Sequence, residues 1–100
     1  MNPQFQIDQG KIAAFCQKWK VAEFSIFGSA LRDDFGPESD VDVLVSFAEE
    51  AHWSLDDWAD MIEELKVIFG RDVDLVSKRA LRNPFRRHEI LTSREVVYVA

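Results

Sequence analysis

The chain is poor in the residues that mark several classes of protein. Its 100 residues include one cysteine, four glycines and three prolines. A lone cysteine, Cys16, excludes an internal disulfide and a multi-thiolate zinc site, and it favours a reducing compartment. The low glycine and proline content argues against disorder, while 47% hydrophobic residues suffice for one core. We therefore expect residues 1–100 to form a single domain.

Cations and long apolar runs are scarce as well. Twelve Lys and Arg oppose eighteen Asp and Glu, which gives a net charge of -6. Because affinity for phosphate backbones rests on surplus cations, we expect no direct binding to nucleic acid. No apolar run approaches the roughly 20 residues that cross a bilayer, and the N-terminus lacks signal-peptide character. These absences predict a cytoplasmic protein without membrane contact.

Hydrophobic periodicity predicts alternating helices and strands. Apolar residues three or four apart indicate helices over residues 8–20, 54–70 and 83–91, and strand composition marks residues 21–27, 40–47, 71–76 and 95–99. Asp8, Ser54 and Asn83 are suitable helix N-caps, and Gly70 is a suitable stop. This order, with a short polar segment after residue 28, predicts an α/β or α+β fold in which helices pack against a sheet.

Two acids open the second predicted strand. Asp40 and Asp42 are two residues apart, so a period of two places both side chains on one face of the sheet. Two uncompensated carboxylates side by side are costly, and a cation is their natural compensation. Mg²⁺ is usually held by one or two carboxylates together with water and phosphate oxygens. The spacing therefore predicts a metal site, although solvated acids at an exposed strand start are the alternative.

A third acid on a neighbouring strand would complete such a site. Asp74 is the favoured candidate because it is embedded in the third strand, whereas Asp72 lies closer to the Gly70 turn and is the fallback. A charged residue on an edge strand is also common for reasons unrelated to function. The predicted metal ligands are therefore Asp40, Asp42 and Asp74.

The turn after the first strand is a candidate phosphate-binding element. At Gly28-Ser29 a glycine lets the backbone approach a ligand, and free N–H groups at a helix start favour phosphate. Alone this signal is weak, because a plain strand-to-helix turn explains it equally well. Arg32 could reach a phosphate or could pair with neighbouring acids. No GxxxxGK[ST] or GxGxxG motif occurs, so neither a Walker-type nor a dinucleotide site is supported.

The cations are gathered late in the chain. Six of the twelve Lys and Arg fall within residues 78–94, whereas most of the acids fall within residues 33–74. A solvated face is the usual explanation of such a stretch, and a docking surface for an acidic partner is the functional alternative.

The segment over residues 28–42 resembles the signature of the DNA polymerase beta-like nucleotidyltransferase superfamily. A strand ends in Gly28-Ser29, and after ten further residues Asp40-Val41-Asp42 opens the next strand. The length and the later segment 73–76 resemble the minimal stand-alone members, the MNT proteins. The resemblance implies a mixed sheet of about four strands flanked by helices.

The resemblance also implies an activity. It assigns triphosphate binding to Gly28 and Ser29, with Arg32 matching a family arginine, and it assigns two Mg²⁺ ions and catalysis to Asp40, Asp42 and Asp74. Such proteins are commonly paired with a HEPN RNase toxin. The implied function is an antitoxin that transfers AMP from ATP to a hydroxyl of that toxin, expected to be a tyrosine's, within a hetero-oligomer.

Two other functions stay open from the sequence. A binding-only antitoxin would occlude its toxin and carry a vestigial site. A small-molecule nucleotidyltransferase would share the fold, but it would need additional substrate-binding structure.

Overall fold

The computed structural model describes residues 8–28 and 40–100 of the chain. Its elements are α1 (Gln9–Lys18), β1 (Val21–Phe27), β2 (Val41–Phe47), α2 (Leu55–Phe69), β3 (Val73–Ser77), η2 (Lys78–Ala80), α3 (Pro84–Ser93) and β4 (Glu95–Val99). The predicted order of helices and strands is confirmed within these residues. The short polar segment expected after residue 28 lies outside them.

The four strands form a mixed sheet in the order β3-β2-β1-β4. β1 pairs antiparallel with β2 and with β4, whereas β2 and β3 run parallel. Parallel neighbours need a crossover, and α2 supplies it. The expected fold, a mixed sheet of about four strands flanked by helices, is confirmed.

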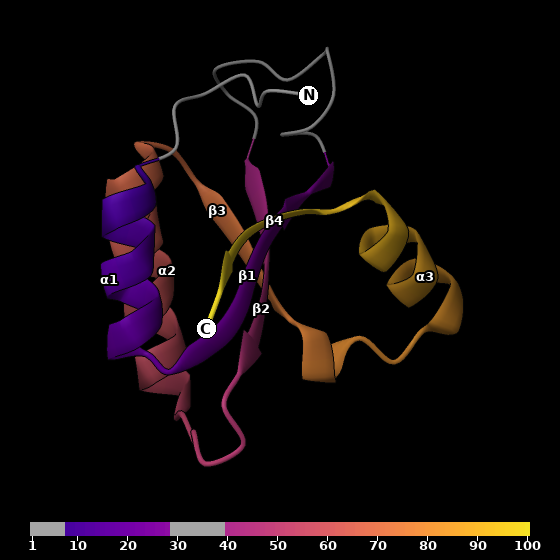
Figure 1. Cartoon of the computed structure of the whole chain (residues 1–100), viewed down its shortest axis with the longest axis horizontal. Coiled ribbons are helices and arrows are strands. Elements are labelled where there is room, and N and C mark those ends of the chain that lie inside the picture. The colour runs from indigo at the N-terminus through magenta and orange to yellow at the C-terminus, as the bar shows by residue number, and fades with distance from the viewer. Residues whose placement is uncertain (1–7, 29–39) are drawn as a thin grey trace.

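Helices cover both faces of the sheet (Figure 1). α1 and α2 lie together against one face, and η2 and α3 lie on the other. Alternation along each strand divides the apolar residues accordingly. The larger core lies under α1 and α2 and includes Phe24, Ile26, Val41, Val43, Met61 and Leu65, all fully buried. The smaller core consists of Phe27, Leu44, Leu81 and Ile90, with Val76 and Leu91 packed against it.

Local sequence signals determine where the helices begin and end. The Asp8 side chain accepts from the Lys11 amide, and Ser54 and Asp57 form a reciprocal capping box. Gly70 ends α2 in the left-handed conformation. α3 begins at Asn83-Pro84 as predicted but runs two residues past the expected end. Thr92 and Ser93, both weak helix formers, donate their hydroxyls to backbone carbonyls one turn earlier.

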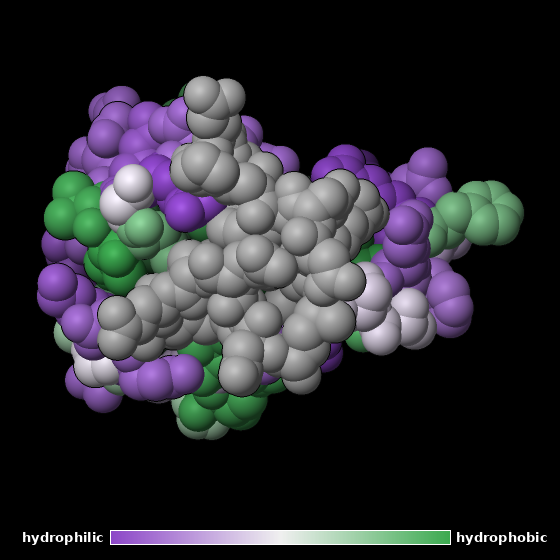
Figure 2. All heavy atoms as spheres, turned by 90° about the horizontal axis from the view of Figure 1, so that it is seen from above, coloured by the Kyte–Doolittle hydropathy of each residue, from purple (hydrophilic) through white to green (hydrophobic). Residues whose placement is uncertain are grey.

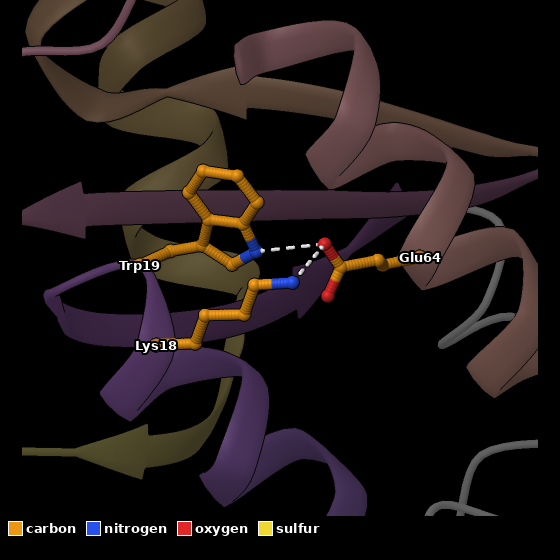
Figure 3. A network of polar contacts seen from close by, with 3 residues as sticks. All are labelled: Lys18, Trp19 and Glu64. Carbon is orange, nitrogen blue, oxygen red and sulfur yellow. Dashed lines mark hydrogen bonds and ion pairs between the residues drawn. The ribbon is translucent and has the colours of Figure 1, made fainter.

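The two helices on the larger core are joined by a polar contact (Figure 3). Glu64 of α2 accepts from the Trp19 indole N–H at 3.2 Å and pairs with the Lys18 ammonium at 2.9 Å. Trp19 is 7% exposed, so its indole N–H needs an acceptor within the protein. The Lys18 ammonium remains well hydrated, so its ion pair with Glu64 contributes less to stability.

Replacing Glu64 tests this difference. Glu64→Ala should lower the free energy of unfolding by about 1–2 kcal/mol, because it leaves the buried indole N–H of Trp19 without its acceptor. Lys18→Ala should change it by less than about 0.5 kcal/mol. Urea denaturation of both variants measures the two values. Equal effects would contradict the larger contribution of the Trp19–Glu64 hydrogen bond.

The single cysteine packs in the larger core. Cys16 is 1% exposed, and burial raises the pKa of its thiol from 9.0 to about 12.

The folded Cys16 thiol should therefore react with a disulfide reagent at pH 8 at least about tenfold more slowly than the thiol in urea. Between pH 9 and about 12 the unfolded chain loses this proton first, so Cys16 should make unfolding easier as pH rises. Fast reaction of the folded thiol at pH 8 would contradict its burial.

Candidate active site

The register of the parallel pair brings two of the predicted acids together. Asp42 of β2 is paired with Asp74 of β3. Neighbouring strands lie about 4.8 Å apart, and paired residues point to the same face. The carboxylates of Asp42 and Asp74 therefore extend from neighbouring positions near the starts of the two strands. Asp42 is partly buried and Asp74 is exposed.

The third acid lies just before β2. Asp40 is exposed, and alternation places it on the same side of the strand as Asp42. The Val41 amide donates to the Asp72 carbonyl at 2.9 Å, which fastens the starts of β2 and β3 to each other. Val41 and Val43 are fully buried on the opposite face, and they anchor the strand that carries the acids.

The fallback acid is placed differently. Asp72 precedes β3, is exposed, and lies 3.8 Å from the Lys66 ammonium. That ion pair turns its carboxylate toward the end of α2. The choice of Asp74 over Asp72 stays a prediction, and the strand register favours it.

Gly28 lies directly against Asp42. Its φ is +71°, and a Cβ at this position would lie 3.1 Å from the Asp42 Cγ and overlap with Oδ2. The positive φ favours glycine, and the absence of a side chain lets the backbone reach the carboxylate. This contact follows from the antiparallel register, in which Phe27 is paired with Asp42. Sequence reasoning placed the turn near the acids but missed the contact, which the pairing of the two strands could have revealed.

Ser29 and Arg32 fall outside the described residues. Within the described ranges, no three His, Cys, Asp or Glu side chains are grouped so that they could hold a metal ion. The donor chemistry is nevertheless suited to Mg²⁺, since all three candidate groups are carboxylates and the ion commonly takes only one or two of them. The metal role of Asp40, Asp42 and Asp74 stays a prediction.

A cavity of about 320 Å³ opens at the other end of β2 and β3. It contains none of the acids. Its lining residues are Ser46, Phe47, Ala48, Ala51, His52, Trp53, Trp58, Ser77 and Arg79.

The contact between Gly28 and Asp42 can be tested by adding a methyl group. Gly28→Ala should destabilise the fold by about 2–3 kcal/mol, because it adds steric overlap to a strained φ. Gly70→Ala is the matched control: its φ is +72° but nothing lies within 4 Å of the added Cβ. The control should cost about 1 kcal/mol. Thermal denaturation compares the two, and equal losses would mean that the carboxylate does not crowd Gly28.

The chain is similar in sequence to known proteins. A family model, the nucleotidyltransferase domain, matches residues 11–97. A Methanocaldococcus jannaschii protein, provisionally named a protein adenylyltransferase, is 35% identical over 82 residues, covering 82% of this chain and 80% of the relative. The protein adenylyltransferase MntA of Thermococcus cleftensis is 37% identical over 83 residues, covering 83% of this chain and 79% of the relative.

Solved structures share the fold. A protein described provisionally as a minimal nucleotidyltransferase superposes with a TM-score of 0.71 at 30% identity, covering 87% of this chain and 86% of its own. A toxin–antitoxin structure with AMP-PNP gives 0.75 at 20% identity, covering 94% and 75%. A Shewanella oneidensis complex of a tri-AMPylated HEPN toxin with an MNT antitoxin gives 0.62 at 20% identity, covering 92% and 70%. At these lower identities the likeness concerns the fold alone.

Proposed function

The chain belongs to the nucleotidyltransferase domain family, and from this premise we propose that it is an antitoxin that transfers AMP from ATP to a hydroxyl of a HEPN toxin. One structural observation carries the proposal: Asp42 and Asp74 are in register on parallel strands, beside Gly28. The names of the relatives support AMP as the transferred group. The complex with a tri-AMPylated HEPN toxin supports the class of acceptor.

The positions of the described residues suit this transfer. The acceptor's hydroxyl oxygen attacks the α-phosphorus of ATP, the bond from that phosphorus to the bridging oxygen breaks, and pyrophosphate leaves. The hydroxyl proton passes to a carboxylate, and Asp74 is placed for this role because it is exposed at the start of an edge strand. Gly28 offers a close backbone approach to the triphosphate. We assign further triphosphate contacts to Ser29 and Arg32.

We infer that Asp40, Asp42 and Asp74 hold Mg²⁺. Such an ion, when bound, would neutralise charge on the phosphates. Two in-register carboxylates repel each other and the triphosphate, and a divalent cation would reduce both repulsions. The three acids therefore supply the negative charge that selects a divalent cation, and their strands fix the separation of those charges.

The proposed unit is one nucleotidyltransferase domain over residues 1–100, since the family match extends over residues 11–97. Among the described helices, none has the length and apolar character that a bilayer span requires. We propose that the protein acts in the cytoplasm, where a toxin that cleaves RNA would be found.

The activity test uses single carboxylate-to-amide changes. Asp42→Asn and Asp74→Asn should each lower AMP transfer at least about a hundredfold, because positioned charge is the main source of catalysis in such sites. The thermal stability of Asp74→Asn should stay the same or rise, since the change removes repulsion between like charges on paired residues. Transfer is measured as label from α-³²P-ATP on the purified HEPN partner, with Mg²⁺ and with EDTA.

Asp72→Asn is the matched control, because Asp72 is a nearby exposed acid that pairs with Lys66. It should retain transfer within about twofold. Full labelling by Asp42→Asn would refute the assignment. Tight binding of the partner with no Mg²⁺-dependent label from the unaltered chain would instead favour an antitoxin that acts by binding alone.

A further inference from the structure

The segment that follows β3 concentrates positive charge in an acidic protein. Residues 78–88 contain five cations and no acid, whereas the whole chain has a net charge of -6. Arg79, Arg82 and Arg86 are exposed, and none of them is in an ion pair with another described residue. Arg87 differs, because it donates to the Lys78 carbonyl at 3.2 Å and ties α3 to η2.

An apolar side chain stands among these cations. Phe85, in the first turn of α3, is 85% exposed. Figure 2 shows an apolar group projecting beyond a hydrophilic surface at the end of the molecule that carries α3. An exposed aromatic ring flanked by arginines has the composition of an interface anchor. We call Arg79, Arg82, Phe85 and Arg86 the η2–α3 surface.

This segment shares a sheet face with the candidate site. Leu44 is two residues beyond Asp42 on β2, and Val76 is two residues beyond Asp74 on β3, so each apolar residue points to the same side as its acid. Leu44 and Val76 pack with Leu81 and Ile90 of the segment that carries the η2–α3 surface. A protein that contacts η2 and α3 therefore lies on the sheet face that begins with the acids.

We propose that the η2–α3 surface docks the acceptor protein, through an acidic patch on that protein with an apolar pocket that takes Phe85. The inference rests on the proposed function and adds the surface that the acceptor contacts. Charge complementarity specifies the acidic patch, and the exposed ring specifies the pocket. A protein is favoured over RNA, because the acidic body of this chain repels a phosphate backbone and Phe85 gains most from an apolar partner.

The test measures binding of the purified HEPN partner, treated with ribonuclease, to the full chain by calorimetry without ATP. Phe85→Ser and Arg86→Glu should each weaken binding at least about tenfold. Neither change should unfold α3: Phe85 is exposed, the Asn83 side chain caps through backbone amides, and an acid in the first turn favours the helix dipole. Thermal denaturation and ATP affinity should stay at the unaltered values.

The matched controls lie on the opposite sheet face. Leu55→Ser changes a residue that is 89% exposed in the first turn of α2, and Lys11→Glu reverses an exposed charge in the first turn of α1. Both should bind within about twofold of the unaltered chain, since they leave the η2–α3 surface intact.

The outcomes separate this inference from the proposed function. If Phe85→Ser and Arg86→Glu bind the partner as well as the controls do, the docking surface is wrong, whether or not AMP is transferred. If binding falls as expected but the unaltered chain transfers no AMP, the surface stands and the catalytic proposal fails. A loss seen only before ribonuclease treatment would assign the surface to RNA. Self-association that Arg86→Glu abolishes would assign it to a second copy, and either result overturns the proposal.

Discussion

The parallel pairing of β2 with β3 is the constraint on which the rest of the site depends. It places Asp42 beside Asp74 at a separation fixed by the sheet, and the buried valines on the other face hold both strands in that register. A slip of β3 by one residue would turn Asp74 into the core under α1 and α2. The same packing that stabilises the fold therefore sets the spacing of the charges.

The two faces of the sheet differ in what covers them. One face is covered by α1 and α2 and contains the larger core, which supplies most of the stability. The other face begins with the acids and continues into the smaller core beneath η2 and α3. Phe85, in the first turn of α3, is exposed and can meet another molecule. The proposed catalytic acids and the proposed partner surface thus lie on the same face of the sheet.

Local chemistry explains why much of the fold could be predicted from sequence. Asp8, Ser54, Asn83 and Gly70 act within one helical turn of their own positions, so their capping roles can be read without knowing the tertiary structure. Strands β1 and β4 have the predicted bounds, because apolar and β-branched residues fill them completely. The short η2 turn was missed, since three residues carry no detectable periodicity.

Long-range pairing limited the prediction of the site. The period of two placed Asp40 and Asp42 on one face, but nothing near Asp74 in the sequence specifies the residue opposite it on β2. The close approach of Gly28 to Asp42 depends on the register between β1 and β2. The position of α3 depends on the packing of Leu81 and Ile90 against Leu44 of β2. These are contacts between segments distant in sequence.

The central claim is that these acids gather a divalent cation together with a nucleotide. Nuclear magnetic resonance of ¹⁵N-labelled protein with Mn²⁺ and AMP-PNP tests it directly, because a paramagnetic ion broadens the amide signals nearest to it. We expect the strongest broadening at Gly28, Asp42 and Asp74, with little at Ser46 and Ser77, which lie roughly 10 Å or more farther along the strands. Broadening centred on Ser46, Ser77 and Trp58 would contradict it.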